Sequence, residues 1–240
     1  MSADNEVLVL IPALNEAPTI SRIVRQVIES GFTPVVIDDA SSDQTAKLAE
    51  GAGALVLRSS FHLGVGGALR LGLRFAAERG ITTVAQCDAD GQHLPSQLQH
   101  LVDNAERLSA DVTVGARKTE STHLSRDTLS RRIAKSLLAR YASRVVGVRL
   151  TDTTSGFRVF RGQIIHELAK NMPNHFLGDT FEVMIVASRS GYKVAEVNVE
   201  MRDREFGSSR ASRYYAFAMT LRVLISAILR LDYRIRPKTS

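Results

Sequence analysis

The sequence contains only one cysteine among 240 residues, Cys87, and this excludes an internal disulfide framework. Such a composition suits a reducing compartment, and because Cys87 lies within an apolar run we expect a buried, unreactive thiol. The first residues lack the basic segment of a signal peptide, and Pro12 and Asn15 interrupt their apolar run. We therefore expect a cytoplasmic protein.

Two common nucleotide-binding motifs are also missing. The segment HLGVGGA at 62–68 is glycine-rich and precedes a predicted helix, as phosphate-binding turns do. However, no Gly-Lys-Ser/Thr follows it, and its glycine spacing is not GxGxxG. Close packing of the helix on a sheet explains these glycines equally well, and His62 suits a surface loop as well as a binding site.

The positive charge of the chain is unevenly distributed. Hydrophobic residues make up 44% of the sequence and charged residues 23%, as in ordinary soluble globular proteins. The net charge of +6 comes from the C-terminal part, where residues 202–240 hold nine Arg or Lys and three acids. A cationic segment of this kind favours an anionic surface as partner. We expect that surface to be lipid, and we expect no nucleic-acid partner.

Short apolar segments alternate with amphipathic ones in the first half of the chain. Strands are predicted at 7–11, 35–37, 54–57, 84–85 and 112–114, and helices at 17–30, 43–51, 65–79 and 96–108. This alternation predicts an α/β protein with a mostly parallel, Rossmann-like sheet flanked by helices. Ligands of such sheets bind beyond the carboxyl ends of the strands, where the sequence places Asn15, Glu16, Asp38, Asp39, Asp88 and Asp90.

The pattern changes after residue 120. The sequence predicts a basic amphipathic helix at 125–147, a polar loop at 151–156, a helix around 178–190, a strand near 194–201 and a final helix from about 211 to 231. No internal repeat, linker or low-complexity segment divides the chain.

The segment DADGQ at 88–92 follows a predicted buried strand and is suited to a divalent cation. Residues i and i+2 of a chain leaving a strand project to the same side, so Asp88 and Asp90 can approach one cation, with Gln92 as a neutral oxygen ligand. Mg²⁺ uses one or two carboxylates plus substrate phosphates, which suits so few protein ligands. The alternative is a solvated loop in which Asp88 caps the following helix and Asp90 begins a turn with Gly91.

Two adjacent acids, Asp38 and Asp39, follow the predicted strand at 35–37. Ser42 or Asp43 suits the N-cap of the helix that follows. Capping does not account for Asp38 and Asp39, and in this position a carboxylate can bind a ribose hydroxyl or a base N–H.

The segment RDREFGSSR at 202–210 combines three arginines with Gly207 and two serines. Arginine and serine side chains around a glycine suit a mobile loop that closes over phosphates. A solvated basic loop is the alternative.

Taken in this order, these segments resemble glycosyltransferase family 2, and more closely its polyprenyl-phosphate branch, similar to dolichol-phosphate mannose synthase. The resemblance runs over roughly residues 6–212. Eight motifs carry it: IPALNEAPTI at 11–20, VVIDDASSDQT at 35–45, GVGGALRLGL at 64–73, DADGQH at 88–93, GARK at 115–118, DTTSGFRVF at 152–160, SGYKVAEVNVEM at 190–201 and REFGSSR at 204–210.

The resemblance implies a GT-A fold and inverting transfer of a sugar from a UDP- or GDP-sugar to a polyprenyl phosphate. Residues 1–210 would form the GT-A catalytic domain, and residues 211–240 a C-terminal amphipathic helix and basic tail within the same structural unit. The nucleotide site would then include Pro12, Asn15, Glu16 and Asp39. The ligands of Mg²⁺ or Mn²⁺ would be Asp88, Asp90 and Gln92.

The same resemblance implies cationic groups around the phosphates of donor and acceptor. They are Arg117, Arg131 or Arg132, and the loop at 202–210 with Arg204, Ser208 and Arg210. Ser155 and Arg158 lie in the motif that resembles the family's loop near the acceptor. Among these residues, Asp90, Arg117 and Arg204 are the predicted catalytic residues.

The sequence departs from the family pattern at two places. His62 stands where relatives often have Asn, and GDTFE at 178–182 replaces the usual Glu-Asp pair, so the resemblance assigns no general base. A phosphate monoester acceptor is already anionic near neutral pH and needs little base catalysis. Neutralisation of charge on the departing diphosphate would then dominate.

The predicted final helix at 214–231 favours membrane contact without a membrane span. It has only 18 residues and contains Arg222 and Arg230, so we expect it to lie in the interface, on the inner face of the cell membrane or against a small membrane protein. Packing in the core or formation of a homodimer is the alternative for this helix.

Three other functions remain open alternatives. A soluble family 2 transferase would act on a small-molecule or glycan acceptor. A nucleotidyltransferase would need a glycine-rich, arginine-containing loop where this chain has PALNE at 12–16. A non-catalytic nucleotide-sugar-binding subunit would not need both Asp88 and Asp90.

Overall fold

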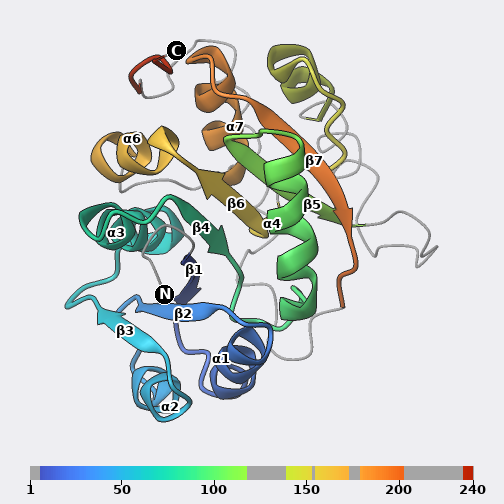
Figure 1. Ribbon diagram of the computed structural model, residues 1–240. Coiled ribbons are helices and arrows are strands. Elements are labelled where there is room, and N and C mark those ends of the chain that lie inside the picture. Colours follow the sequence, from blue (N-terminus) through green and yellow to red (C-terminus); the bar gives the residue numbers. More distant parts are fainter. Residues whose placement is uncertain (1–5, 118–138, 153–154, 173–178, 203–234, 240) are drawn as a thin grey trace, which may run out of the picture.

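The fold is built around a twisted seven-stranded sheet (Figure 1). The computed structural model describes residues 6–117, 139–152, 155–172, 179–202 and 235–239. The strand order is β3-β2-β1-β4-β6-β5-β7. The strands are β1 (Val7–Ala13), β2 (Thr33–Asp38), β3 (Leu55–Arg58), β4 (Thr83–Gln86), β5 (Val112–Arg117), β6 (Arg158–Arg161) and β7 (Val194–Val199).

The pairing of the strands confirms the predicted α/β class and the mostly parallel sheet. The pairs β1–β2, β2–β3, β1–β4 and β5–β7 are parallel, whereas β6 runs antiparallel to both β4 and β5. The strand β6 was not predicted, because only four residues form it and two of them are arginines.

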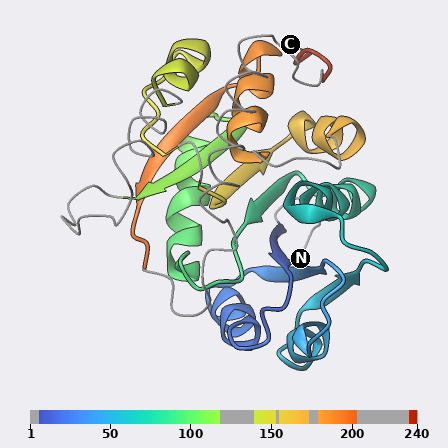
Figure 2. The same cartoon turned by 180° about the vertical axis from the view of Figure 1, so that it is seen from behind.

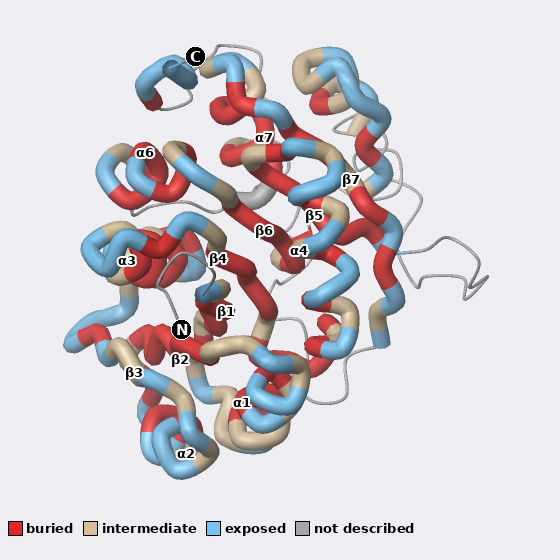
Figure 3. Tube along the Cα trace, viewed as in Figure 1, coloured by how far each residue is buried: buried red, intermediate tan, exposed pale blue. Residues whose placement is uncertain are grey.

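Helices cover both faces of the sheet (Figures 1 and 2). One apolar cluster joins alternate strand residues such as Leu8 and Leu10 to α3, α6 and α7, and the other joins Val9 and Ile11 to α1, α2 and α4. Figure 3 shows the central strands as a buried layer between these helices, whereas β3 at the edge of the sheet is partly exposed. The helices are α1 (Ile20–Glu29), α2 (Thr45–Gly51), α3 (Gly64–Glu78), α4 (Leu98–Arg107), α6 (Gln163–Asn171) and α7 (Asp179–Arg189), with a 3₁₀ turn, η2 (Pro95–Gln97), before α4.

The first two helices begin later than predicted. Helix α1 begins at Ile20 because the residues before it form a turn in which Asn15 takes a φ of 55°. Helix α2 begins at Thr45 with Gln44 as its N-cap, so the prediction of Ser42 or Asp43 was wrong. Asp43 still accepts a hydrogen bond from the backbone N of Thr45 at 2.9 Å, one residue outside the cap position.

Several predictions on the second half of the chain fall outside the described residues. Of the predicted helix at 125–147, residues 139–146 are described and are helical. The predicted helix at 211–231 lies outside the described residues altogether. In the described part of the chain, no helix is long and apolar enough to cross a membrane.

The end of the predicted basic tail packs against the domain. Ile235 is only 7% exposed and belongs to the apolar cluster with α6 and α7. The backbone N of Arg236 donates to Glu167 Oε2 at 3.0 Å, and Lys238 Nζ lies 2.9 Å from Asp111 Oδ2. Because Asp111 directly precedes β5, these contacts attach the tail at the amino end of that strand.

The glycine-rich segment at 62–68 leads into α3, and close packing explains a glycine of this helix. A Cβ added at Gly72 would lie 2.8 Å from Leu10 Cδ1 and 3.0 Å from Ile37 Cδ1, so α3 approaches the sheet more closely than alanine permits.

We predict that Gly72→Ala costs about 1–3 kcal/mol of unfolding free energy, because its methyl group overlaps two core side chains. Chemical denaturation followed by circular dichroism measures this cost. The matched control is Gly51→Ala, where a Cβ meets nothing within 4 Å; a gain of about 0.5–1 kcal/mol is expected there. Equal stability of the two variants would contradict the close packing of α3.

Candidate active site

The loops that follow β1 and β2 are tied together by hydrogen bonds. The backbone N of Asn15 donates to Ser41 Oγ at 2.9 Å, and Asn15 Oδ1 accepts from the backbone N of Ser42 at 2.8 Å. The backbone N of Glu16 donates to Thr45 Oγ1 at 2.8 Å. Pro12 pairs with Ile37 in the ladder between the two strands. The structure therefore brings the predicted nucleotide-binding residues of these two loops to one edge of the sheet.

Asp39 binds the first turn of α3. Its Oδ1 accepts from the backbone N of Leu63 at 2.6 Å, and its Oδ2 accepts from the backbone N of Gly64 at 2.9 Å. Its Oδ2 also lies 2.7 Å from Nδ1 of His62, whose side chain is otherwise exposed. The Asp39 carboxylate thus holds the start of α3, a structural role that the sequence did not indicate. Its contact with His62 places that residue at the same edge of the sheet.

Asp38 is fully buried and is matched by a cation. Its Oδ2 forms an ion pair with Arg58 Nε at 3.2 Å but has no hydrogen-bond partner among the described residues, and its Oδ1 accepts from the backbone N of Ser41 at 3.2 Å. A buried carboxylate is costly unless it is paired in this way. Asp38 therefore supports the loop after β2.

Residues 88–92 form a tight turn beyond β4, at the same edge of the sheet. Gly91 takes a φ of 81°, and Asp90 Oδ1 accepts from the backbone N of Gln92 at 3.0 Å. The Asp88 side chain is 39% exposed, whereas Asp90 is only 7% exposed. The turn at Asp90 and Gly91 agrees with the alternative stated above, but η2 and α4 have no side-chain cap, so Asp88 does not cap the following helix.

Gly156 allows the Asp88 carboxylate to take its position. A Cβ added at Gly156 would lie 2.6 Å from Asp88 Oδ1 and 2.8 Å from Oδ2. The register of β4 and β6, in which Gln86 faces Arg158, places residues 88 and 156 opposite each other just beyond the strands. The predicted acceptor loop, with the buried Ser155, therefore lies directly against the 88–92 turn.

Arg158 does not lie where a substrate contact requires it. Its side chain is 0% exposed, on the sheet face covered by α3, α6 and α7, with its guanidinium 5.7 Å from the centre of the Phe160 ring. The predicted contact between Arg158 and the acceptor stays a prediction, and the burial of this guanidinium does not favour it. A position inside β6 gives the reason, because alternate residues of a strand in the middle of a sheet point into its two buried faces.

Two arginines lie beside the 88–92 turn. Arg117, at the exposed end of β5, donates from Nη2 to the carbonyl O of Arg202 at 3.0 Å. The backbone N of Arg202 in turn donates to the carbonyl O of Gln92 at 2.9 Å. The structure thus places the first residue of the predicted 202–210 loop against the candidate metal ligand Gln92, and Arg117 against that first residue. The other predicted phosphate-binding residues lie outside the described residues: Arg131, Arg132, Arg204, Ser208 and Arg210.

Helix α1 also contacts the turn, through two residues that the sequence did not single out. The Oγ1 of Thr19, the residue before α1, donates to the carbonyl O of Ala89 at 2.6 Å. A Cβ added at Gly91 would lie 2.9 Å from Arg22 Nη2, so this guanidinium lies against the turn. The spacing of three residues puts both side chains on one face of a helix. The sequence has this spacing, but it does not show that this face meets residues 88–92.

Cys87 is buried beneath the same turn, as predicted. Burial raises the pKa of its thiol well above the ordinary value, and the charges of Asp88 and Asp90 raise it further. The neutral thiol is therefore the stable form, and Cys87 serves as a small packing residue.

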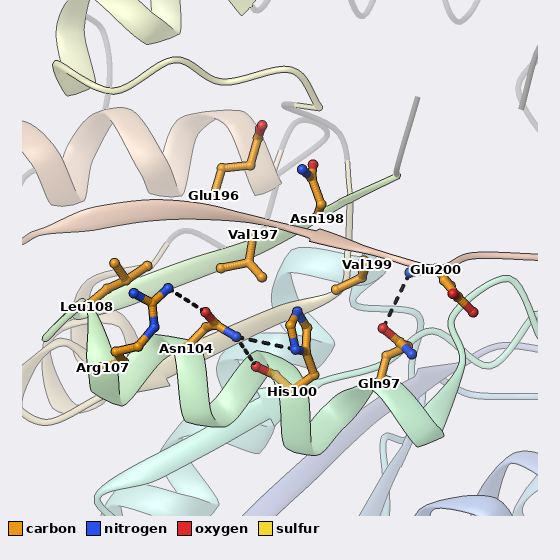
Figure 4. Close-up of a pocket in the computed structure, with 10 residues that line it drawn as sticks. All are labelled: Gln97, His100, Asn104, Arg107, Leu108, Glu196, Val197, Asn198, Val199 and Glu200. Atoms are coloured by element: carbon orange, nitrogen blue, oxygen red, sulfur yellow. Dashed lines mark hydrogen bonds between the residues drawn. The ribbon is translucent and has the colours of Figure 1, made fainter. Parts of the chain in front are cut away.

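A separate groove of about 560 Å³ lies between α4 and β7 (Figure 4). In this view Val197 and Val199 point toward α4, whereas Glu196 and Asn198 point away from it. The groove contains none of the predicted site residues. The candidate active site is therefore the edge of the sheet where the loops after β1, β2 and β4 meet the segment before β6.

Comparison with solved structures identifies the fold. Glucosyl-3-phosphoglycerate synthase from Mycobacterium tuberculosis, solved in complex with Mn²⁺, UDP and glucosyl-3-phosphoglycerate, aligns with a TM-score of 0.66. The alignment has 19% sequence identity and covers 94% of this chain and 79% of that chain. This likeness and the sheet order define a GT-A glycosyltransferase fold, as the sequence motifs implied.

Residues 8–169 match the sequence profile of glycosyl transferase family 2, and the chain belongs to this family. It is 30% identical over 216 residues to undecaprenyl-phosphate mannosyltransferase of Micrococcus luteus, with 86% of this chain and 87% of the relative covered. It is 24% identical over 228 residues to UDP-N-acetylglucosamine–dolichyl-phosphate N-acetylglucosaminyltransferase of Methanococcus voltae, with 88% and 91% covered. These relatives confirm the polyprenyl-phosphate branch that the motifs indicated.

We predict that Gly156→Ala weakens Mn²⁺ binding about tenfold, the size of effect seen when the surroundings of a metal ligand are disturbed. The added methyl group overlaps the Asp88 carboxylate and must displace it, while the φ of Gly156 lies outside the left-handed range, so the backbone accepts alanine. Titration followed by electron paramagnetic resonance measures free Mn²⁺. Gly51→Ala is again the control, and unchanged Mn²⁺ affinity in Gly156→Ala would contradict Asp88 as a ligand.

Proposed function

We propose that this chain is an inverting glycosyltransferase that moves a sugar from a UDP- or GDP-sugar to a polyprenyl phosphate at the cytoplasmic face of the membrane. The observation that carries the proposal is the 88–92 turn at the carboxyl edge of the sheet, which holds two carboxylates and is joined to Arg117 through the backbone of Arg202. Family membership and the named relatives support the reaction and the lipid-phosphate acceptor.

The donor set of the turn fits a cation that is shared with a diphosphate. In the described part of the chain, no three His, Cys, Asp or Glu side chains converge on one point. Two carboxylates and an amide are the hard oxygen ligands that suit Mg²⁺ or Mn²⁺ when diphosphate oxygens complete the coordination. Asp88, Asp90 and Gln92 would hold the ion, which when bound neutralises charge on the diphosphate leaving group.

The reaction requires one bond to form and one to break. A phosphate oxygen of the acceptor attacks the anomeric carbon from the face opposite the nucleoside diphosphate. The bond from that carbon to the diphosphate oxygen breaks, and its electron pair leaves with the nucleotide. The attacking oxygen is already anionic, so no side chain has to remove a proton. This agrees with a site in which carboxylates and arginines, and no assigned base, gather around the reacting groups.

The side chains and loops of this chain would bind the donor and the acceptor and orient them for the reaction. The loops after β1 and β2, with Asn15, Glu16 and Asp39, would bind the nucleoside, since they end at the same edge as the 88–92 turn. Arg117 would bind a phosphate, because a guanidinium forms paired hydrogen bonds with phosphate oxygens. Ser155 and Gly156 would border the acceptor side.

A soluble acceptor is the second candidate. The solved neighbour from Mycobacterium tuberculosis was crystallised with a phosphorylated glycerate product, which has no lipid chain. Transfer to 3-phosphoglycerate in the absence of lipid or detergent would favour this alternative.

We predict that Asp90→Asn lowers transfer to undecaprenyl phosphate by a factor on the order of 10², because charge stabilisation of the leaving group is lost. The assay uses the full chain, Mn²⁺ or Mg²⁺ and a panel of UDP- and GDP-sugars, with 3-phosphoglycerate as the competing acceptor. Asp103→Asn in the exposed part of α4 is the matched control. Metal-stimulated transfer that persists in Asp90→Asn would contradict the proposed role of this carboxylate.

We also predict that the full chain floats with anionic liposomes at low salt and is released at high salt. Each basic residue near an anionic surface contributes on the order of 1 kcal/mol, and salt screens this attraction within a Debye length. Truncation of the C-terminus is unsuited to this test, because Ile235 is part of the core. Absence of flotation at low salt would count against membrane contact and in favour of the soluble acceptor.

A further inference from the structure

His93 lies where three segments of the candidate site meet. It directly follows the 88–92 turn, and its side chain is buried, with the residue only 4% exposed. Its ring stacks on Phe157 of the segment before β6, with 5.0 Å between ring centres and 20° between ring planes. Its backbone pairs with Met201, one residue before Arg202. No other role has been assigned above to this imidazole.

The imidazole accepts a hydrogen bond from the backbone of a candidate metal ligand. The backbone N of Asp88 donates to His93 Nδ1 at 3.0 Å. Because Nδ1 accepts this proton, the proton of the neutral ring is on Nε2. Asp88 Oδ2 lies 3.7 Å from the same Nδ1, too far for a hydrogen bond, so the contact that matters is the one to the backbone.

The hydrogen bond fixes the direction of the peptide before Asp88. Four further contacts already restrain residues 88–91, namely Thr19 on the carbonyl of Ala89, Arg22 against Gly91, Gly156 against the carboxylate and the backbone N of Gln92 on Asp90 Oδ1. None of them contacts the amide of Asp88. The His93 ring therefore holds the backbone amide of Asp88, the residue from which the carboxylate projects.

We propose that His93 is a positioning residue for Asp88: its unprotonated Nδ1 holds the Asp88 amide and so keeps the carboxylate in the orientation that binds the divalent cation. The inference rests on the proposed function, since it assigns His93 to the same cation site. In the simpler explanation, His93 only packs against Phe157. The two explanations predict different effects of two substitutions on Mn²⁺ binding.

The two substitutions separate the hydrogen bond from the packing. His93→Asn keeps an acceptor, because Asn Oδ1 takes the place of Nδ1, but it loses the ring. His93→Phe keeps a ring that can stack on Phe157 but has no acceptor. His100→Asn is the matched control, because His100 is exposed on α4 and lies outside the turn.

The first measurement is Mn²⁺ binding to the full chain, alone and with UDP or GDP, followed by electron paramagnetic resonance. We expect His93→Phe to weaken Mn²⁺ binding about tenfold, as loss of a group that orients a ligand does, and His93→Asn to stay within about threefold of the original chain. Melting temperatures of all variants are measured in parallel. If His93→Asn binds Mn²⁺ more weakly than His93→Phe does, packing is what matters and the proposal is overturned.

The second measurement requires neither a bound metal ion nor transferase activity. Long-range ¹⁵N NMR correlation of the full chain reports which ring nitrogen of His93 carries the proton. The proposal requires a protonated Nε2 and an Asp88 amide that exchanges slowly with solvent, and a proton on Nδ1 overturns it. If the original chain binds no Mn²⁺ with either nucleotide, the cation site of the proposed function fails, whereas the tautomer still decides whether His93 holds Asp88.

Discussion

The antiparallel pairing of β6 between β4 and β5 is the constraint on which the candidate site depends. A strand that runs parallel to β4 would begin at the amino edge of the sheet, far from Asp88. Because β6 runs the other way, it begins at the carboxyl edge, and the residues before it reach the 88–92 turn. Gly156 then lies against Asp88, and Phe157 lies against His93. One reversed strand thus brings the two halves of the site together.

The carboxylates at this edge are stabilised by different partners. Asp38 has Arg58, and Asp39 has two backbone N–H groups at the start of α3 together with His62. A helix N-terminus carries partial positive charge, so it suits Asp39 without a full cation. Asp88 stays 39% exposed, at the place where a cation and a diphosphate would approach. The loop after β2 is therefore held by contacts within the protein, and in the proposed function such preorganisation would lower the ordering cost of nucleotide binding.

Much of the fold follows from local sequence pattern, and much of the site does not. The runs at 7–11, 35–37 and 112–114 are apolar because both faces of these strands are covered, so the sequence alone finds them. Strand β6 was not predicted by this pattern, because Arg158 occupies a buried strand position at which an apolar residue is expected. Helix α6 follows directly after it and was missed with it.

The candidate site, like the fold, could be predicted only in part from the sequence. The acidic residues at the strand ends can be identified from the sequence, because carboxylates are unusual directly after a buried apolar strand. The contacts of Thr19, Arg22 and His93 with the 88–92 turn depend on which helix face or loop meets it, and in the first two cases the partners are about 70 residues apart in the chain. The contacts of Thr19 and Arg22 come from the strand order, and the contact of His93 comes from the shape of its own turn, so the sequence pattern predicted none of the three.

The C-terminal part of the chain is attached to the domain at two distant points. Arg202 is bound to Gln92 and Arg117 at the carboxyl edge of the sheet, and Ile235 is packed near the amino ends of β5 and β7. The carbonyl of Arg202 accepts a hydrogen bond from the Arg117 guanidinium, so the first residue of the predicted 202–210 loop contacts a predicted phosphate-binding group. In the proposed function, this hydrogen bond therefore connects the start of the basic segment at 202–210 with the guanidinium that would bind a phosphate.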